Sequence, residues 1–269
     1  MRRLASPRPA KVSPRPARGQ SGGLVASDSR RGHTTVRIDR VNSLVCSYLG
    51  LRDYAEARLY QESLAKEVAA GARPGLLLLL EHPAVFTVGR HASLSDEVCT
   101  RLEASGVPLH RTGRGGGLTW HGPGQLVVYP VLPLRAAGRG VRAFVEALTR
   151  GVQAGLSAEG VESFCRTGAP GLFVGGENDG VRKIASIGLG VQRGVTLHGA
   201  AINLDARAKA GFLGLAPCGL TDVVATSVEN ERPGPPPQLK EFAQRLAPVL
   251  AEHLDFPEVT FVPAPGMES

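Results

Sequence analysis

The fold is decided by residues 183–204, which read KIASIGLGVQRGVTLHGAAINL. Two runs of apolar and small residues, Lys183–Gln192 and Val195–Leu204, flank the dipeptide Arg193-Gly194. A two-residue turn that contains glycine joins neighbouring antiparallel strands. We therefore predict a β-hairpin here, which disfavours a purely parallel sheet built from strand–helix–strand units.

Outside this hairpin, the predicted strands and helices alternate along the chain. Gly75–Glu81 is a continuous apolar run, which is typical of a strand buried on both faces. Apolar residues at helical spacing and cap residues such as Ser95 indicate helices. The helices are predicted at 54–70, 95–105, 140–158 and 238–254, and the other strands at 44–49, 85–89, 117–120, 125–134 and 171–174. This combination predicts an α/β (α+β) fold, a mixed β-sheet flanked by helices.

One glycine-rich connection separates two of these strands. His121-Gly122-Pro123-Gly124 lies between the predicted strands 117–120 and 125–134. Glycine and proline punctuate strands at turns. We expect this segment to form a hairpin-like turn or an active-site turn.

The basic charge is concentrated at the N-terminus. The whole chain of 269 residues has a formal charge of +7, but residues 1–40 contain ten Lys/Arg and two Asp, which leaves 21 basic and 22 acidic residues for the rest. Residues 1–42 are rich in Arg, Pro and Ser, so we expect a disordered basic extension rather than an amphipathic transit peptide. A catalytic domain is predicted at 43–255 and a C-terminal tail at 256–269.

The composition disfavours several classes of protein. The four cysteines, at positions 46, 99, 165 and 218, are far apart and form no C-x-x-C pair, which disfavours a disulfide framework or a metal site. The longest strongly apolar run, Leu76–Leu80, is too short to span a bilayer. Free thiols indicate a reducing compartment.

Four segments could carry chemistry, and each also has a structural interpretation. The glycine-rich run that begins at Gly113 either lets a ligand approach the backbone or forms a tight turn; no Gly-Lys-Ser/Thr follows, which disfavours a phosphate loop. Lys183 either faces solvent or stabilises a reactive group, because its ammonium is a compact charge. His198 is either structural or catalytic. Cys218 is either an inert core residue or a thiolate at a helix start near Thr221.

Taken together and in this order, five segments resemble the motifs of the lipoyl (octanoyl) transferase family, LipB type. The resemblance covers residues 44–255 and is specific because five ordered matches are needed. The segments are EHPAVFTVGR at 81–90, RGGGLTWHGPGQ at 114–125, KIASIG at 183–188, LHG at 197–199 with Asn203, and PCG at 217–219.

The resemblance implies the fold, the reaction and the site. The family fold resembles the catalytic domain of biotin and lipoate protein ligases. Cys218 would be the acyl-thioester nucleophile, and Lys183 the residue that lowers its pKa. The acyl site would be lined by Arg114, Gly115, Gly116, Gly117, Leu118, Thr119, Trp120, His121, Ser186, Ile187, Gly188, Leu197, His198 and Gly199. Trp120 stands where many members have tyrosine, and Leu197 where phenylalanine is common, which puts the chain-length preference in doubt.

The resemblance also implies the partners. The octanoyl group would pass from acyl carrier protein to a specific lysine of lipoyl domains in 2-oxoacid dehydrogenase complexes and of the glycine cleavage H protein. We expect no cofactor, no metal, no nucleic acid and no membrane, and a cytoplasmic location, or the mitochondrial matrix in a eukaryote.

Two other functions stay open at this point. An ATP-dependent lipoate or biotin ligase on the same fold would need an adenylation site and no cysteine nucleophile. A non-catalytic carrier-binding homologue would need neither Lys183 nor Cys218. RNA or membrane-surface binding through residues 1–40 is an accessory possibility.

Overall fold

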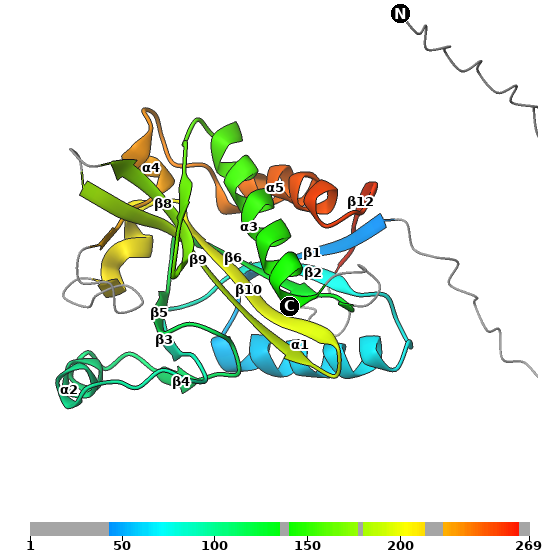
Figure 1. Cartoon of the computed structure of the whole chain (residues 1–269), viewed down its shortest axis with the longest axis horizontal. Coiled ribbons are helices and arrows are strands. Elements are labelled where there is room, and N and C mark those ends of the chain that lie inside the picture. Colours follow the sequence, from blue (N-terminus) through cyan, green and yellow to red (C-terminus); the bar gives the residue numbers. More distant parts are fainter. Residues whose placement is uncertain (1–42, 135–139, 177–179, 213–222, 264–269) are drawn as a thin grey trace, which may run out of the picture. The chain divides into compact units, whose positions relative to one another are not determined.

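A computed structural model describes residues 43–134, 140–176, 180–212 and 223–263 (Figure 1). The predicted basic extension, residues 1–42, and Cys218 both lie outside the described residues. The helices are α1 (Tyr54–Ala69), α2 (Asp96–Ala104), α3 (Val141–Ala158), α4 (Val228–Glu231) and α5 (Leu239–His253), with a 3₁₀ helix η1 (Ala206–Phe212).

The strands form two sheets. The strands of the larger sheet are β1 (Ser43–Leu51), β2 (Leu76–Glu81), β6 (Gln125–Val131), β7 (Phe164–Arg166), β8 (Ala169–Gly176), β9 (Gly180–Gln192), β10 (Val195–Asn203), β11 (Val224–Ala225) and β12 (Glu258–Phe261). Those of the smaller sheet are β3 (Val85–Val88), β4 (Leu109–Arg111) and β5 (Leu118–His121).

The large sheet is mixed, as predicted. Its order is β12-β1-β2-β6-β10-β9-β8-β7, and β11 pairs with β9. β12, β1 and β2 run parallel to one another, whereas each pair of neighbours from β2 through β6, β10, β9 and β8 to β7 is antiparallel. The predicted hairpin is β9–β10, in which Val195 pairs with Gln192 around the Arg193-Gly194 turn. The predicted fold class is therefore confirmed.

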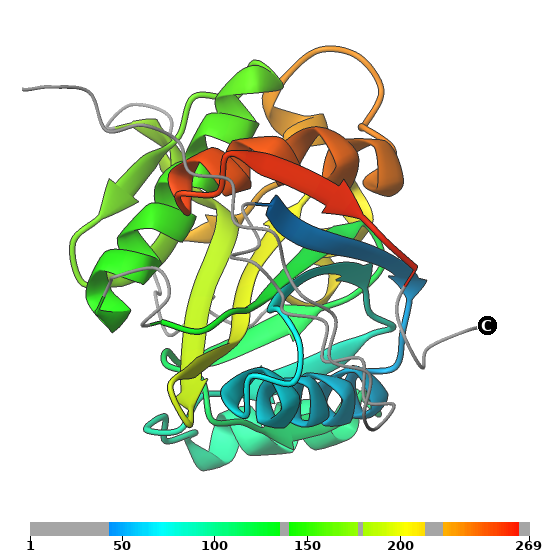
Figure 2. The same ribbon diagram turned by 90° about the vertical axis from the view of Figure 1, so that its right-hand side faces the viewer.

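Strand β2 shows why the large sheet has a core on each face. Leu77 and Leu79 belong to a core that includes α3 and α5, whereas Leu76, Leu78 and Leu80 belong to a core that includes α1. Successive side chains of a strand point to opposite faces. Figures 1 and 2 accordingly show α1 on one side of the sheet and α3 and α5 on the other. The continuous apolar run predicted this double burial correctly.

The connection between β5 and β6, predicted as a hairpin-like turn or an active-site turn, is not a hairpin. β5 pairs with β3 in the small sheet, and β6 pairs with β2 and β10 in the large one. The chain therefore leaves one sheet and enters the other across residues 122–124. This crossing brings the two sheets together around the candidate site.

The large sheet also continues beyond residue 255, where we expected a tail to begin. Strand β12 pairs in parallel with β1, with Ser43 opposite Glu258 and Cys46 opposite Phe261. Its backbone gains hydrogen bonds from the sheet although its side chains are mostly exposed. A short, half-exposed strand of this kind leaves little hydrophobic pattern in a sequence.

Candidate active site

A cavity of about 190 Å³ opens between the two sheets. The large sheet contributes β6, β8, β9 and β10, the small sheet contributes β5, and the start of α1 and the glycine-rich loop before β5 complete the wall. Its lining residues are Tyr54, Arg114, Gly116, Gly117, Thr119, His121, Tyr129, Gly168, Ala169, Pro170, Ser186, Ile187, Gly188, His198, Gly199, Ala200 and Ala201.

Most of the residues that the sequence predicted for the acyl site come together in this cavity. Those that line it are Arg114, Gly116, Gly117, Thr119, His121, Ser186, Ile187, Gly188, His198 and Gly199. Those that do not are Gly115, Leu118, Trp120 and Leu197. The exceptions have two causes, the alternation of side chains along a strand and a backbone contact of the loop.

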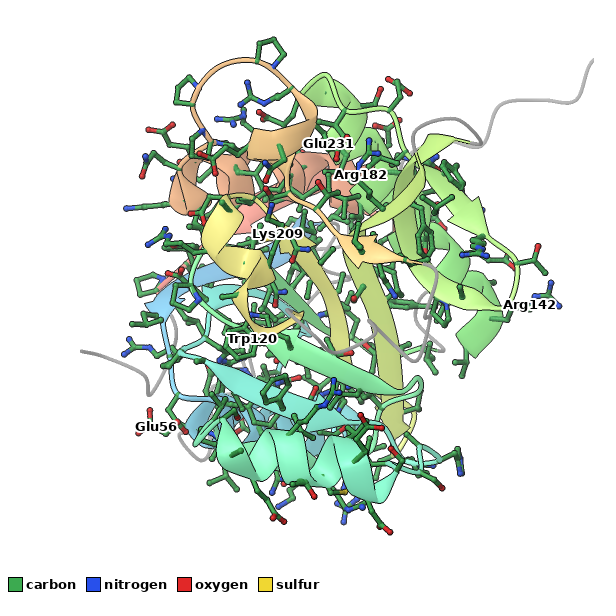
Figure 3. All side chains as sticks on the ribbon, turned by 90° about the vertical axis from the view of Figure 1, so that its left-hand side faces the viewer. Glu56, Trp120, Arg142, Arg182, Lys209 and Glu231 are labelled. Carbon is green, nitrogen blue, oxygen red and sulfur yellow. The ribbon has the colours of Figure 1, made fainter. Side chains whose placement is uncertain are left out.

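Trp120 and Leu118 lie on the other face of β5 from the cavity. Thr119 and His121 line the cavity, and alternation along the strand turns their neighbours away. The Trp120 ring packs 5.1 Å from the ring of Phe86, in a small core with Leu118 and residues of α2. The prediction that residues 114–121 all line the cavity did not take this alternation into account. Figure 3 shows where Trp120 lies.

Leu197 and Gly115 also have roles outside the cavity wall. Leu197 packs against the core on the α1 side of the large sheet. The backbone N–H of Gly115 donates to the carbonyl of Leu189, 3.0 Å away, which fastens the glycine-rich loop to β9. Gly115 therefore helps to position the loop without facing the cavity.

The backbone of β10 is distorted where it meets the cavity. His198 has φ 59° and Gly199 has φ 156°. A side chain on Gly199 would place its Cβ 2.3 Å from the carbonyl oxygen of Val128. The His198 N–H donates to Oε1 of Gln61 on α1, 2.9 Å away. A non-glycine residue at positive φ carries strain, and such strain is concentrated at functional sites.

Lys183 is buried next to the cavity rather than exposed to solvent. It is 2% exposed. Its Nζ donates to the carbonyl oxygen of Pro170, 2.8 Å away, and lies 5.4 Å from the centre of the Phe173 ring. Pro170 itself lines the cavity. Gly171, at φ 134°, makes room for this lysine, because a Cβ there would lie 2.7 Å from the Lys183 Cε.

The chain that follows Cys218 returns beside Lys183. Strand β11 pairs with β9 so that Ala225 lies opposite Lys183, and the N–H of Thr226 donates to the Lys183 carbonyl, 2.9 Å away. The helix start that we expected near Thr221 lies outside the described residues; among the residues described after it, Val224–Ala225 is a strand and the helix α4 begins at Val228.

An ion pair fixes this return strand. Arg182 donates to both carboxylate oxygens of Glu231, at 2.8 and 2.9 Å (Figure 3). The Thr226 hydroxyl donates to the same carboxylate, 2.6 Å away. The hydrogen bond from Arg182, and then that from Thr226, lowers the pKa of Glu231 against the opposing effect of burial. The pair ties β9 to the end of α4.

Two buried histidines, His121 and His198, line the cavity, a third, His82, lies next to His121, and none carries charge at neutral pH. Burial lowers the pKa of His121 to about 3, and that of His82 and of His198 to about 4. A buried imidazole resists protonation because its charged form loses hydration. Arg114 is also largely buried and donates to the Thr87 carbonyl at 2.7 Å and to the Gly115 carbonyl at 2.9 Å.

Two tyrosines in the wall were missed by the sequence reasoning. The Tyr129 hydroxyl is hydrogen-bonded to Nε2 of His82, 2.9 Å away. The buried Tyr54 hydroxyl has no hydrogen-bond partner among the described residues. Tyr54 sits in the first turn of α1 and Tyr129 within a fully buried strand. Both patterns are equally typical of core residues, so no local signal distinguished them. The other lining residues that were missed are Gly168, Ala169, Pro170, Ala200 and Ala201.

Two other features, a metal site and a membrane-spanning helix, are not found in the described part of the chain. Within those residues, no group of three or more His, Cys, Asp or Glu is arranged to hold a metal ion. None of the helices described is long and apolar enough to cross a membrane.

Comparison with known proteins gives the class to which this fold and cavity belong. Residues 53–251 match the family described as lipoyl protein ligase A/B catalytic domain. Among solved structures, lipoate-protein ligase A bound with ATP aligns with a TM-score of 0.61 at 16% identity, covering 82% of this chain and 88% of that one. A bipartite lipoate protein ligase from Thermoplasma acidophilum aligns with a TM-score of 0.59 at 15% identity, covering 82% and 86%. The chain belongs to the lipoyl protein ligase A/B catalytic domain family.

Sequence relatives narrow this class to the octanoyltransferases. The octanoyltransferase of Syntrophotalea carbinolica is 40% identical over 184 residues, 68% of this chain and 81% of its own length. That of Geobacter sulfurreducens is 39% identical over 68% of this chain and 73% of its own length. A mitochondrial octanoyltransferase of Arabidopsis thaliana is 34% identical over 81% of this chain and 92% of its own length. The family resemblance predicted from the sequence is confirmed.

Proposed function

We propose that this octanoyltransferase accepts an octanoyl group from acyl carrier protein on Cys218 and passes it to a lysine of a lipoyl domain. The observation that best supports this proposal is the buried Lys183 beside a cavity whose histidines are uncharged. An apolar acyl chain can pack against neutral histidine rings in the wall, and a buried ammonium stabilises a thiolate.

The reaction proceeds in two transfers. In the first, the Cys218 thiolate attacks the thioester carbonyl, the carbon–sulfur bond to the carrier breaks, and the released carrier thiolate takes up the proton of the Lys183 ammonium, which leaves Lys183 as a neutral amine. In the second, the neutral amine of the target lysine attacks the acyl-enzyme, a carbon–nitrogen bond forms, and the bond to Cys218 breaks. As an ammonium, Lys183 stabilises the Cys218 thiolate before the first transfer. As the neutral amine left by that transfer, it accepts the proton of the incoming amine, and the restored ammonium again stabilises the released Cys218 thiolate.

The energetics explain why this route needs no nucleotide. Exchange of one thioester for another is nearly neutral, and conversion of a thioester to an amide is downhill. An ATP-dependent ligase instead has to activate a free acid. The two solved lipoate ligases are 16% and 15% identical to this chain, and this similarity supports a shared fold but not a shared cofactor.

The test is acylation without ATP. The purified protein is incubated with octanoyl-acyl carrier protein, and the mass of the protein is measured before and after treatment with hydroxylamine. We expect one octanoyl adduct on Cys218 that hydroxylamine removes, and no adduct on Cys218→Ser. Lys183→Met should acylate at least about 100-fold more slowly, which is the usual contribution of a positioned acid or base.

The control uses a cysteine outside the proposed chemistry. Cys165 is a free, exposed cysteine, and Cys165→Ser should acylate at the wild-type rate. An adduct that forms only with ATP would favour the ligase, and transfer by Cys218→Ser at the wild-type rate would exclude the covalent route.

We further propose the lipoyl domains of 2-oxoacid dehydrogenase complexes and the glycine cleavage H protein as acceptors. The proposed location is the cytoplasm, or the mitochondrial matrix in a eukaryote. Mass analysis of each acceptor after incubation with acylated enzyme tests the first point, because a single modified lysine is expected.

A further inference from the structure

A chain of hydrogen bonds runs from the cavity wall to the strand beside Lys183. Arg114 Nη2 donates to the Thr87 hydroxyl at 2.8 Å, and that hydroxyl lies 3.4 Å from Nε2 of His121. Nδ1 of His121 lies 2.7 Å from Oε1 of Gln125, and Nε2 of Gln125 donates to Oδ1 of Asn203 at 3.0 Å. This chain of hydrogen bonds continues beyond Asn203.

Its last member is a backbone carbonyl. Nδ2 of Asn203 donates to the carbonyl oxygen of Thr226, 2.8 Å away, and the Thr226 N–H is bound to Lys183. The four side chains between Arg114 and Thr226, those of Thr87, His121, Gln125 and Asn203, belong to residues that are at most 7% exposed. Water is therefore largely excluded from the chain, so its members have to satisfy one another.

The two ends of the chain permit only one direction of donation. A guanidinium can only donate and a backbone carbonyl can only accept. Because Thr226 accepts, Asn203 has to present its NH₂ there and its oxygen to Gln125. Gln125 therefore presents its NH₂ to Asn203 and its oxygen to His121.

The same logic fixes the proton on His121. An oxygen faces Nδ1, so Nδ1 carries the hydrogen. The Thr87 oxygen already accepts from Nε and Nη2 of Arg114, so its own hydrogen points to Nε2 of His121. The opposite tautomer would place the lone pair of Nδ1 against the oxygen of Gln125 at 2.7 Å.

The other groups around His121 also disfavour an imidazolium. His82 lies 5.8 Å from it and Tyr54 6.3 Å, measured between ring centres. Burial, and then His82, lower the pKa of His121; the hydrogen bond with Gln125 opposes them, and Arg114 and His198 lower it further. No carboxylate is among the groups found to act on its pKa within the described residues. Its ring therefore adds an uncharged surface to the cavity.

We infer that Gln125 and Asn203 are positioning residues for octanoyl transfer: as uncharged partners they hold the buried His121 in the Nδ1–H tautomer, so that a neutral imidazole faces the acyl cavity. The effect of these two residues on octanoyl transfer rests on the proposed function, whereas the hydrogen-bond geometry around His121 does not depend on it. Neither amide lines the cavity, so each acts through His121.

The first test is a spectrum of the unmodified protein. Proton–nitrogen correlation spectra of protein labelled with ¹⁵N-histidine distinguish the two tautomers and the imidazolium, and His121→Asn identifies the His121 signals. At pH 7 we expect Nδ1 to be protonated and Nε2 not. An Nε2–H tautomer, a doubly protonated ring or an equal mixture would overturn the inference.

The second test introduces a charge at Gln125. Gln125→Glu keeps the oxygen next to His121 but makes it a carboxylate, which favours the imidazolium. We expect a doubly protonated His121 at pH 7. The KM for the octanoyl donor should rise about tenfold and kcat should change less than about threefold, because a charge on His121 weakens ground-state binding of the acyl chain. An unchanged KM in a folded Gln125→Glu protein would overturn the inference.

The matched control is Gln153→Glu. Gln153 lies on α3, and its Nε2 donates to the Ser163 carbonyl, away from the cavity lining. The same change there should leave both KM and the His121 signals as in the wild type. If both variants only lowered the melting temperature, the role of Gln125 would be structural.

A pair of Asn203 variants tests the other amide. Asn203→Asp still accepts from Gln125 and should keep the single tautomer. Asn203→Leu removes this acceptor, leaves Nε2 of Gln125 with the longer of its two hydrogen bonds, that to the Trp120 carbonyl at 3.3 Å, and should give signals of both tautomers. A single tautomer in folded Asn203→Leu would exclude a positioning role for Asn203, and if that variant does not fold, the wild-type and Gln125→Glu spectra still decide. A protein that forms no Cys218 adduct would refute the proposed function and leave these spectra unaffected.

Discussion

Two glycines of this chain have nearly the same backbone conformation but different surroundings. Gly194 turns β9 into β10 at φ 79°, and Gly124 leads from the β5–β6 crossing into β6 at φ 84°. Around Gly194, an added Cβ would meet no atom within 4 Å. Around Gly124, it would lie 2.0 Å from the Asp205 carboxylate.

The difference teaches which turn depends on local chemistry and which on the rest of the fold. Arg193 and Gly194 both have positive φ, the conformation of a tight hairpin turn, and they join two strands that pair with each other. Gly124 instead leads from one sheet into another, and its N–H donates to Oε1 of Glu81, 2.6 Å away. Only distant residues explain its position.

The largest expected effect is that of Gly124→Ala. The added methyl group would collide with Asp205, which is held by Arg207 at 2.6 Å, and the residue would also be strained at positive φ. We expect the free energy of unfolding to fall by about 3 kcal/mol or more, as is typical of strain combined with overpacking. Urea denaturation followed by circular dichroism measures this loss.

A second substitution separates the two causes of that loss. Asp205→Ala removes the colliding carboxylate, so Gly124→Ala should cost less in the Asp205→Ala background than in the wild type. An equal cost in both backgrounds would mean that backbone strain alone is responsible.

This contrast also explains what could be predicted from the sequence. The β9–β10 hairpin, the doubly buried β2 and the Ser95 cap of α2, whose hydroxyl accepts from the Val98 N–H, are local patterns and were predicted correctly. The β5–β6 crossing was not, because a Gly-Pro-Gly segment has the same local signature in a hairpin and in a crossing between sheets. Pairing of β12 with β1 depends on contacts more than 200 residues apart and has the same limitation.

In the candidate site, too, some residues could be predicted from sequence motifs, and other features depend on contacts that are distant in the sequence. Lys183 came from a recognised motif, and its burial was not predictable because the space for it is made by Gly171 and Phe173. Trp120 was placed in the cavity by its motif and is excluded by strand alternation. Tyr54 and Tyr129 were missed because each looks like a core residue in its own element.

The next largest effect is a loss of stability in mild acid, to which both regions contribute a histidine. The pKa of His121 beside the crossing is about 3, and that of His198 in the hairpin is about 4. As the pH falls below about 6.5, the unfolded chain binds protons at these positions and the folded chain does not. Stability should therefore fall by up to about 1.4 kcal/mol per pH unit for each such histidine.

Denaturation at several pH values between 6.5 and 5 checks this slope. Carboxylates with lowered pKa, such as Glu231, lose their contribution only at lower pH, which separates them from the histidines. His198→Asn should flatten the slope, and asparagine tolerates the positive φ of this position. A slope that stays the same in His198→Asn would mean that this histidine is already protonated in the folded protein or titrates alike in both states.

The smallest expected effect is that of Gly194→Ala. Because nothing lies within 4 Å of the added Cβ, only the strain of a positive φ remains, which costs about 1 kcal/mol. Gly194→Asn should cost less still, since asparagine adopts this conformation more readily than alanine. Melting curves of both variants, recorded beside Gly124→Ala, measure the difference, and octanoyl transfer should proceed at the wild-type rate in both. A loss at Gly194 as large as that at Gly124 would show that backbone conformation, and not the crowding by Asp205, sets the cost of a side chain at these two turns.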